Sequence, residues 1–293
     1  MRFQSIFRPG LFDGQVVVVT GGGSGIGRCT AHELASLGAR VALVGRRPDK
    51  LAGVAAEIEA EGGVASTHAC DIREEAAVAE VVDAVLAQHG RIDGLVNNAG
   101  GQFFAPLSEI STKGFDAVLR SNLTGGFIFM REAYRRWMAE HGGAIVNMSA
   151  DMWMGLPGIA HSGAARAGMN SLTESAACEW AANGVRVNSV APGMIASSGF
   201  DNYTGDAVGR ILDYVHRIPA QRYGTVSEVS AAVVFLLPPA AASTTGTCLR
   251  VDGGGPNARS SWQLQPHARS IPFEGFHLDA TPRLLQGRRR DAG

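Results

Sequence analysis

Short apolar runs alternate with longer amphipathic segments along residues 16–251. A short apolar run that ends in glycine or polar residues is typical of a buried strand, whereas apolar positions spaced three to four residues apart are typical of a helix. This pattern predicts strands at 16–20, 40–44, 64–68, 92–96, 144–148, 185–190 and 247–251. It predicts helices at 26–37, 48–61, 74–89, 163–182 and 226–237, and a helical region at 112–141 with a break near Gly125 and Gly126.

Strand and helix alternate throughout this region, which predicts an α/β fold: a doubly wound parallel sheet with helices on both faces. We assign residues 1–253 to a single Rossmann-type domain. Residues 195–217 contain Gly199, Gly205 and Gly209, which suits a mobile lid over a substrate. The pattern ends after residue 253, so we expect residues 254–293 to form an extension that is partly disordered or an arm on a neighbouring subunit.

Composition narrows the class of protein further. The chain has 293 residues, 45% of them hydrophobic, and a net charge of −1, so it can bury a large core and is not expected to bind nucleic acid. It contains no apolar run of the ~20 residues that a membrane span needs and no signal-peptide pattern. Its four cysteines lack metal-ligand spacing, so we expect no metal site and a reducing, cytoplasmic location.

A glycine-rich turn follows the first predicted strand and reads T-G-x-x-x-G-x-G over residues 20–27. Gly21 permits the sharp turn, Gly25 lets the backbone approach a pyrophosphate, and Gly27 lets the helix pack close to the sheet. The N-terminus of the following helix offers free N–H groups to phosphates. The turn therefore predicts a dinucleotide site that also includes Gly23, Ser24 and Ile26.

The residues after the second predicted strand indicate which dinucleotide binds. An enzyme that uses NAD usually carries a carboxylate there for the ribose 2′-hydroxyl, but this chain has Arg46 and Arg47. Arginine can hold a 2′-phosphate through two hydrogen bonds, so we predict NADPH; the alternative is an ordinary solvated arginine pair. Asp71 and Ile72 follow the third strand and are expected to face the adenine.

The chain resembles the short-chain dehydrogenase/reductase family over roughly residues 14–253. The resemblance rests on the glycine turn and on Asn97-Asn98-Ala99-Gly100, Asn122, Ser149, Pro192-Gly193 and Val251-Asp252-Gly253-Gly254. It implies a seven-stranded sheet, a homo-oligomer (dimer or tetramer) and a small-molecule substrate. It also implies cofactor contacts from Asn98, Ala99, Gly100, Arg166, Pro192, Gly193, Ile195 and Ser197.

The catalytic residues depart from that family. Its members have a Tyr thirteen residues after the catalytic Ser and a Lys four residues later, whereas this chain has Ser162 and Arg166 at that spacing from Ser149. A Ser hydroxyl is a much weaker acid than a phenol, whose pKa is about 10, and Arg stays protonated where Lys can titrate. His161 becomes a candidate only if the register shifts by one residue. Asn122 is expected to bind a water of the proton relay or to serve structure alone.

In lacking this tyrosine the chain resembles the trans-2-enoyl-CoA and 2,4-dienoyl-CoA reductases of the family. This resemblance implies acyl-CoA chemistry. Hydride would add to the β-carbon, and Ser149 and Ser162 would stabilise the enolate oxygen by hydrogen bonds. A water or a lid hydroxyl such as Tyr203 would protonate the α-carbon; an ionised Asp151 would oppose the enolate unless its pKa is raised. The alternatives are a carbonyl or 3-hydroxyacyl-CoA oxidoreductase with an unconventional acid, and a catalytically inactive NADP-binding scaffold.

Overall fold

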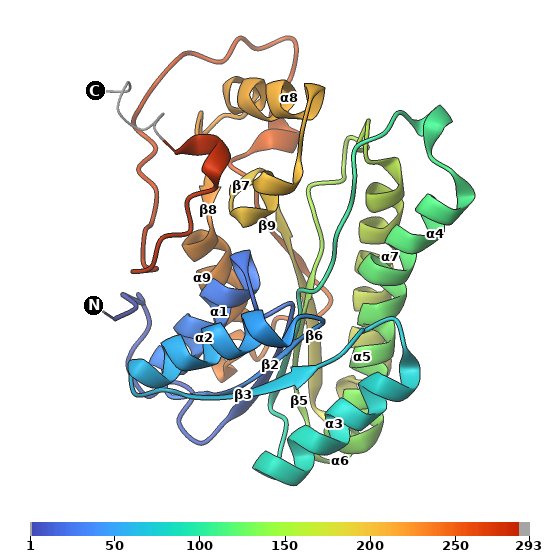
Figure 1. Cartoon of the computed structure of the whole chain (residues 1–293), viewed down its shortest axis with the longest axis vertical. Helices are drawn as coiled ribbons and strands as arrows, with labels where there is room; N and C mark the ends of the chain where they lie inside the picture. Colours follow the sequence, from blue (N-terminus) through green and yellow to red (C-terminus); the bar gives the residue numbers. More distant parts are fainter. Residues whose placement is uncertain (1, 287–293) are drawn as a thin grey trace.

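The centre of the molecule is a parallel sheet, seen in a computed structural model that describes residues 2–286 (Figure 1). Within these residues seven strands pair in the order β3-β2-β1-β4-β5-β6-β9, and every pairing is parallel. The prediction of a doubly wound, seven-stranded parallel sheet is therefore confirmed. The strands are β1 Val16–Thr20, β2 Arg40–Gly45, β3 Val64–Ala69, β4 Gly94–Asn97, β5 Gly143–Met148, β6 Val185–Pro192 and β9 Cys248–Val251.

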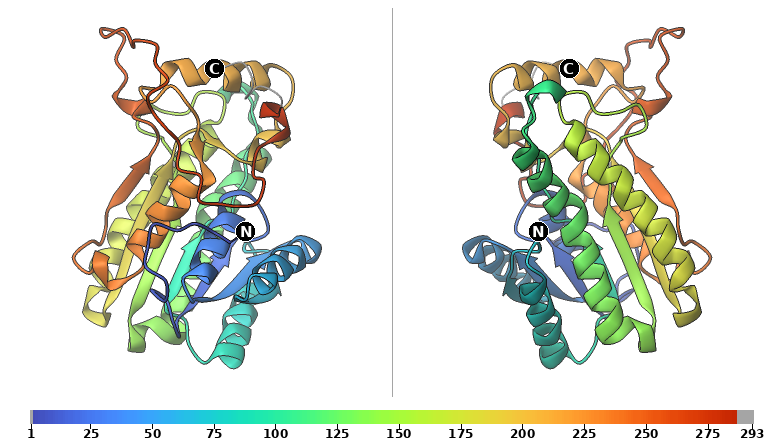
Figure 2. Two further views of the ribbon diagram at one scale, coloured as in Figure 1. Left: turned by 90° about the vertical axis from the view of Figure 1, so that its left-hand side faces the viewer. Right: turned by 90° about the vertical axis from the view of Figure 1, so that its right-hand side faces the viewer.

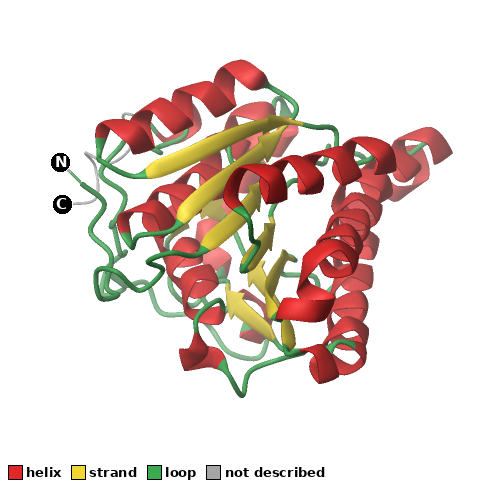
Figure 3. Cartoon of the chain, turned by 90° about the horizontal axis from the view of Figure 1, so that it is seen from below, coloured by secondary structure: helices red, strands yellow, loops and turns green. Residues whose placement is uncertain are grey.

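Apolar side chains on both faces of the sheet explain why it is covered on both sides (Figure 3). Every residue of β1 is buried, as expected for a central strand rich in valine. One core lies under α1 Gly25–Ser36, α2 Pro48–Ala60 and α9 Val226–Leu236. The other lies under α3 Glu75–His89, α5 Gly125–Ala133 and α7 Ala160–Glu179. No helix in residues 2–286 is long and apolar enough to cross a membrane.

The helical region predicted at 112–141 contains two π-helical turns. It consists of α4 Thr112–Leu119, a π turn at Arg120–Thr124, α5, a second π turn at Tyr134–Met138 and α6 Ala139–His141. The irregularity thus lies just before Gly125 and Gly126. A Cβ on Gly125 would lie 2.7 Å from the Ile72 side chain, so this glycine lets the helix pack closely on the loop that follows β3.

The lid region contains a helix that the sequence pattern did not predict. Residues 195–217 include α8 Asp206–Tyr214, and a short pair of strands, β7 Ile195–Ala196 and β8 Gly224–Thr225, holds the base of the segment. The helix was missed because it is short and contains Gly209, which is unfavourable in a helix. Its mobility over a substrate stays a prediction.

The C-terminal extension runs over the face of the domain formed by α1 and α9 (Figure 2). The Gln4 N–H donates to the Gly275 carbonyl at 2.8 Å, and Thr225 Oγ donates to the Phe273 carbonyl at 2.7 Å. Phe276 is buried in the core beneath these contacts. The described part of the extension therefore contacts its own domain, while 287–293 lie outside the described residues. Partial disorder and packing on a neighbouring subunit stay predictions.

Candidate functional site

The glycine-rich turn has the conformation that its glycines suggest. Gly21 and Gly25 have φ angles of +67° and +53°, which favour glycine. A Cβ on Gly27 would lie 2.3 Å from the Gly21 carbonyl oxygen, so a larger residue cannot fit against the turn. The first turn of α1 begins beside Gly23 and Ser24, which line a cavity. Its free N–H groups and partial positive charge suit an anion there.

Replacing Gly27 by alanine is expected to lower the free energy of unfolding by about 2–3 kcal/mol, because the new methyl group overlaps backbone that cannot move away. Urea denaturation would measure this. The matched control is Gly53→Ala on the exposed side of α2, where no atom lies within 4 Å of the added Cβ. We expect that variant to be neutral or about 0.5–1 kcal/mol more stable. Equal unfolding free energies for both variants would contradict the close packing at Gly27.

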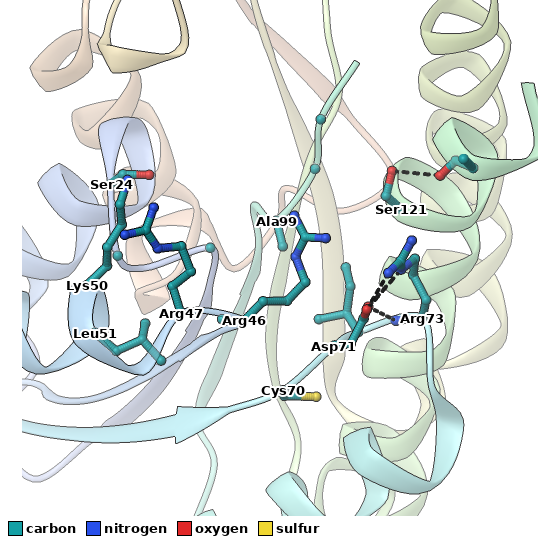
Figure 4. A pocket seen from close by; sticks show the side chains of 17 residues that line it. Ser24, Arg46, Arg47, Lys50, Leu51, Cys70, Asp71, Arg73, Ala99 and Ser121 are labelled. Atoms are coloured by element: carbon teal, nitrogen blue, oxygen red, sulfur yellow. Dashed lines mark hydrogen bonds and ion pairs between the residues drawn. The ribbon is translucent and has the colours of Figure 1, made fainter. Parts of the chain in front are cut away.

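A cavity of about 300 Å³ opens at this turn (Figure 4). Its walls come from the carboxyl ends of β1, β2, β3 and β4, which is the edge where open α/β sheets bind ligands. The predicted cofactor residues that line it are Gly21, Gly23, Ser24, Arg46, Arg47, Asp71, Ile72, Ala99 and Gly100. The structure thus brings the turn, the arginine pair and the end of β4 together.

Positive side chains outnumber negative ones in this lining. Arg46 and Arg47 extend over the cavity, and Lys50 and Arg73, which sequence reasoning missed, also line it (Figure 4). Hydrogen bonds from Arg73 to Asp71 lower the pKa of that carboxyl to about 2. Asp71 therefore stays ionised and paired with Arg73. The remaining cations suit a ligand that carries phosphate groups, so the lining fits the pyrophosphate of a dinucleotide.

Other predicted cofactor residues lie around the cavity and not in its lining. Asn98 Nδ2 donates to the Thr20 carbonyl at 2.9 Å, which braces the turn from behind. Ser197 Oγ lies 4.0 Å from where a Cβ on Gly25 would be, so the lid begins next to the turn. The predicted residues outside the lining are Gly25, Ile26, Gly27, Asn98, Arg166, Pro192, Gly193, Ile195 and Ser197.

Four polar side chains form a hydrogen-bonded chain beyond this cavity. Asn122 Nδ2 donates to Ser162 Oγ over 3.4 Å, and Ser162 Oγ donates to Gln102 Oε1 at 2.5 Å. Gln102 Nε2 donates in turn to the Tyr203 hydroxyl oxygen at 3.0 Å. The chain connects α7 to the lid through the loop after β4. Among the described residues no acceptor takes the Tyr203 hydroxyl proton, so that proton is available to a ligand.

Arg166 supplies a cation beside this chain. A Cβ on Gly100 would lie 2.7 Å from both Arg166 Nη2 and Asn122 Oδ1, and Arg166 Nη1 donates to the Met148 carbonyl. Burial lowers the pKa of the guanidinium to about 10, so it remains protonated at neutral pH. Ser149 Oγ donates to the Arg166 carbonyl at 3.3 Å. The predicted catalytic residues Asn122, Ser149, Ser162 and Arg166 therefore lie within one network of contacts.

His161 does not occupy the position of the missing tyrosine. The ring is buried, its Nδ1 accepts from the Ser162 N–H at 2.9 Å, and it packs edge-on against Phe103 with centroids 4.4 Å apart. Ser162 instead presents its hydroxyl to Asn122 and Gln102. The geometry thus favours the register that places Ser162 at the catalytic position.

Asp151 lies at the end of the same sheet edge. Its N–H donates to the Pro192 carbonyl at 3.1 Å. Its Oδ2 and the Tyr214 hydroxyl lie 3.1 and 3.5 Å from where a Cβ on Gly255 would be. Burial, and then the negative charge of Asp252, raise the pKa of the Asp151 carboxyl to about 6. A carboxyl that is partly protonated near neutral pH and the phenol of Tyr214 therefore lie close together beside Gly255.

Large apolar side chains are exposed on the loops that follow β4 and β5. The loops after β4 and β5 lie side by side, joined by a hydrogen bond from the Ala105 N–H to the Gly158 carbonyl at 2.8 Å. Both loops carry large apolar side chains that are exposed to solvent. Such exposure is typical of a binding surface. The exposed residues are Phe103, Leu107, Trp153 and Met154.

Sequence reasoning missed Gln102 in this site. No spacing rule selects a glutamine in a loop. Gln102 joins the site because the lid brings Tyr203 to the loop after β4. The two residues are 101 positions apart in the sequence. Long-range contacts of this kind leave no local signal.

Comparisons with known proteins identify relatives of this chain. The profile of a protein family described as Enoyl-(Acyl carrier protein) reductase matches residues 21–255. The peroxisomal 2,4-dienoyl-CoA reductase [(3E)-enoyl-CoA-producing] of Danio rerio is 35% identical over 86% of this chain and 85% of its own length. Gluconate 5-dehydrogenase of Gluconobacter oxydans is 38% identical over 84% of this chain and 97% of its own.

One solved structure is more similar in sequence. The citronellol catabolism dehydrogenase AtuB of Pseudomonas aeruginosa PAO1 is 55% identical, covers 86% of this chain and 99% of its own, and superposes with a TM-score of 0.78. The relatives thus include both reductases of unsaturated acyl-CoA and dehydrogenases of other substrates.

Proposed function

Because the chain belongs to the short-chain dehydrogenase/reductase family and is an NAD(P)-dependent oxidoreductase, we propose that it reduces the C=C bond of a 2-enoyl-CoA or a related acyl thioester with NADPH. One observation carries the proposal. Where the family has a tyrosine, this chain has Ser162, which lies among hydrogen-bonding side chains and beside the cation of Arg166. Such a site stabilises negative charge by hydrogen bonds and a nearby cation, and it lacks the family's tyrosine at the position of Ser162.

The fit of a nicotinamide dinucleotide rests on the cationic lining of the cavity and on the start of α1 beside Gly23 and Ser24, whose free N–H groups suit a phosphate. When bound, the cofactor supplies a hydride to the β-carbon of the substrate. The chain's own residues must then stabilise the charge that builds on the thioester oxygen. The Ser149 and Ser162 hydroxyls can rotate from their present acceptors to that oxygen, and the nearby Arg166 cation favours the enolate.

The α-carbon also needs a proton, and two side chains can deliver it. The Tyr203 hydroxyl is oriented by Gln102, and its own proton has no acceptor among the described residues. The Asp151 carboxyl is partly protonated near neutral pH because its pKa is about 6. The exposed apolar residues of the loops after β4 and β5, among them Trp153 and Met154, would contact the acyl chain.

A pH profile distinguishes these two donors. If Asp151 donates the proton, kcat/KM should be constant below about pH 6 and fall as the pH rises through the pKa, because the acid form is then lost. The Asp151→Asn variant should be slower and lack this limb, with cofactor affinity unchanged. The Tyr203→Phe variant tests the other candidate donor in the same way, because it removes the phenolic proton. A wild-type profile that is flat from pH 5 to 8, together with a slow Tyr203→Phe variant, would assign the proton to Tyr203 instead.

A second function is supported by the 55% identical structure described as a citronellol catabolism dehydrogenase. Its substrate class would be a branched, apolar alcohol or its aldehyde, which the exposed Phe103 and Trp153 could also contact. Ser162 and Tyr203 would then have to serve as an unconventional acid in carbonyl reduction.

The deciding experiment measures NADPH oxidation with crotonyl-CoA, a dienoyl-CoA, acetoacetyl-CoA and citronellal, and NADP⁺ reduction with citronellol. The proposal predicts that the enoyl or dienoyl thioester has a kcat/KM at least tenfold above the others. A preference for citronellol or citronellal would establish the second function, and a preference for acetoacetyl-CoA would indicate carbonyl chemistry. NADPH binding without turnover of any substrate would refute both proposals. Assembly as a dimer or tetramer remains a prediction.

A further inference from the structure

Three potential metal ligands meet on the face of the domain opposite α3, α5 and α7. His32 lies in α1, Glu61 directly follows α2, and His277 belongs to the C-terminal extension. One ligand atom from each lies within 4.8 Å of the other two. Glu61 Oε1 is 3.5 Å from His32 Nδ1 and 2.6 Å from His277 Nε2. The two imidazoles therefore converge on one carboxylate oxygen.

The hydrogen bonds of His32 fix which nitrogen carries its proton. Glu57 accepts two hydrogen bonds of 2.8 Å from Arg28 and is therefore a carboxylate. His32 Nε2 lies 3.0 Å from Glu57 Oε2, and this contact needs a proton on Nε2. Nδ1 of a neutral His32 then holds a lone pair. It is buried, it has no hydrogen-bond partner among the described residues, and it faces Glu61.

Two acceptors that face each other in a buried site repel unless a proton or a cation lies between them. The His277 contact does not resolve it: with a proton on Nε2 it satisfies Glu61 Oε1 at 2.6 Å, but His32 Nδ1 and the buried His277 Nδ1 still lack partners among the described residues. A cation in place of that proton would give His32 Nδ1 a partner.

We propose that His32 Nδ1, Glu61 Oε1 and His277 Nε2 bind a divalent transition-metal ion of the Zn²⁺ type. Two imidazoles and one carboxylate are a known ligand set for zinc, which then keeps a further position for water. Glu57 has the role that an orienting carboxylate has behind a zinc-bound histidine, and Arg28 holds it in place.

The surroundings suit such a site. The ring of Phe276 packs against both imidazoles, with centroids 5.1 Å from His32 and 5.8 Å from His277, so the two rings have little freedom to turn away. A cavity of about 390 Å³ that His32 and Glu61 help to line provides access for the ion and a water. The ion would join the extension to the helix that begins at the cofactor turn.

This site is independent of the proposed reaction, and metal binding tests it directly. The full chain, purified without a histidine tag and stripped with a chelator, should take up one Zn²⁺ per chain. With Co²⁺ it should show the visible absorption of a tetrahedral complex. Zinc at 100 times its Kd should raise the Tm by about 5 °C. His277→Gln should weaken Zn²⁺ binding at least tenfold and remove the shift in Tm, since second-shell changes alone cost 10–100-fold.

His267→Gln is the matched control, because His267 lies in the same extension, is exposed and hydrogen-bonds the Pro219 carbonyl. It should bind Zn²⁺ like the wild type. Glu61→Gln provides a second ligand variant that keeps a polar side chain beside His277, and it should also lose the Co²⁺ spectrum. The proposal fails if the wild type takes up no metal, or if His277→Gln and Glu61→Gln bind Zn²⁺ as tightly as His267→Gln does.

Discussion

Replacing Arg46 by aspartate is expected to reverse the cofactor preference, lowering the ratio of kcat/KM for NADPH to that for NADH by about 10²–10³-fold. The change removes charge-assisted hydrogen bonds to a 2′-phosphate and adds a repelling carboxylate, and each of these effects amounts to about tenfold or more. The carboxylate can also accept from a ribose 2′-hydroxyl, as in enzymes that use NAD. Initial rates with each cofactor at fixed substrate measure the ratio.

Arg47 provides the comparison for this prediction. Its guanidinium already donates to Asp49 in an exposed ion pair, whereas Arg46 extends over the cavity near Asp71 (Figure 4). We therefore expect Arg47→Ala to change the ratio less than Arg46→Asp does. A wild-type enzyme that uses NADH and NADPH equally well, or an Arg46→Asp variant with an unchanged ratio, would be inconsistent with a 2′-phosphate site at Arg46.

The fold could be predicted from sequence because its signals are local. The apolar run at 16–20 becomes the fully buried β1, and the predicted helix at 226–237 becomes α9 with a capping box formed by Thr225 and Glu228. Each pattern depends only on residues within about one element. The pattern predicted a break near Gly125 and Gly126 but not the π-helical turn at Arg120–Thr124, where Asn122 makes long-range contacts with the Gly101 N–H and with Ser162.

The candidate site was predictable only in part, because some of its contacts join residues that are far apart in the sequence. Motif spacing identified Ser149, Ser162 and Arg166, and the structure brings them together. The Gln102 side chain was not predicted, since its partners come from α7 and the lid. The raised pKa of Asp151 depends on burial and on Asp252, 101 residues away in sequence, which no local pattern contains.

Arg166→Met is expected to lower kcat by about 10²–10³-fold, comparable to removing a donor from an oxyanion site. Methionine approximates the length of the side chain, so the main loss is the positive charge next to Gly100 and Asn122. Cofactor affinity, measured by NADPH fluorescence, and the far-UV circular dichroism spectrum distinguish a loss of charge from a loss of structure. We expect the spectrum to be unchanged.

Arg166→Lys distinguishes an electrostatic role from a purely structural one. The wild-type guanidinium has a pKa of about 10 and so keeps its charge throughout the working range. A lysine ammonium in the same half-buried position has its pKa lowered by desolvation. Its activity should therefore be retained at low pH and lost as the pH rises through that pKa, a limb absent from the wild type. If Arg166 serves only to hold the Met148 carbonyl, Arg166→Lys will keep the wild-type pH profile, and Arg166→Met will change the Tm more than kcat.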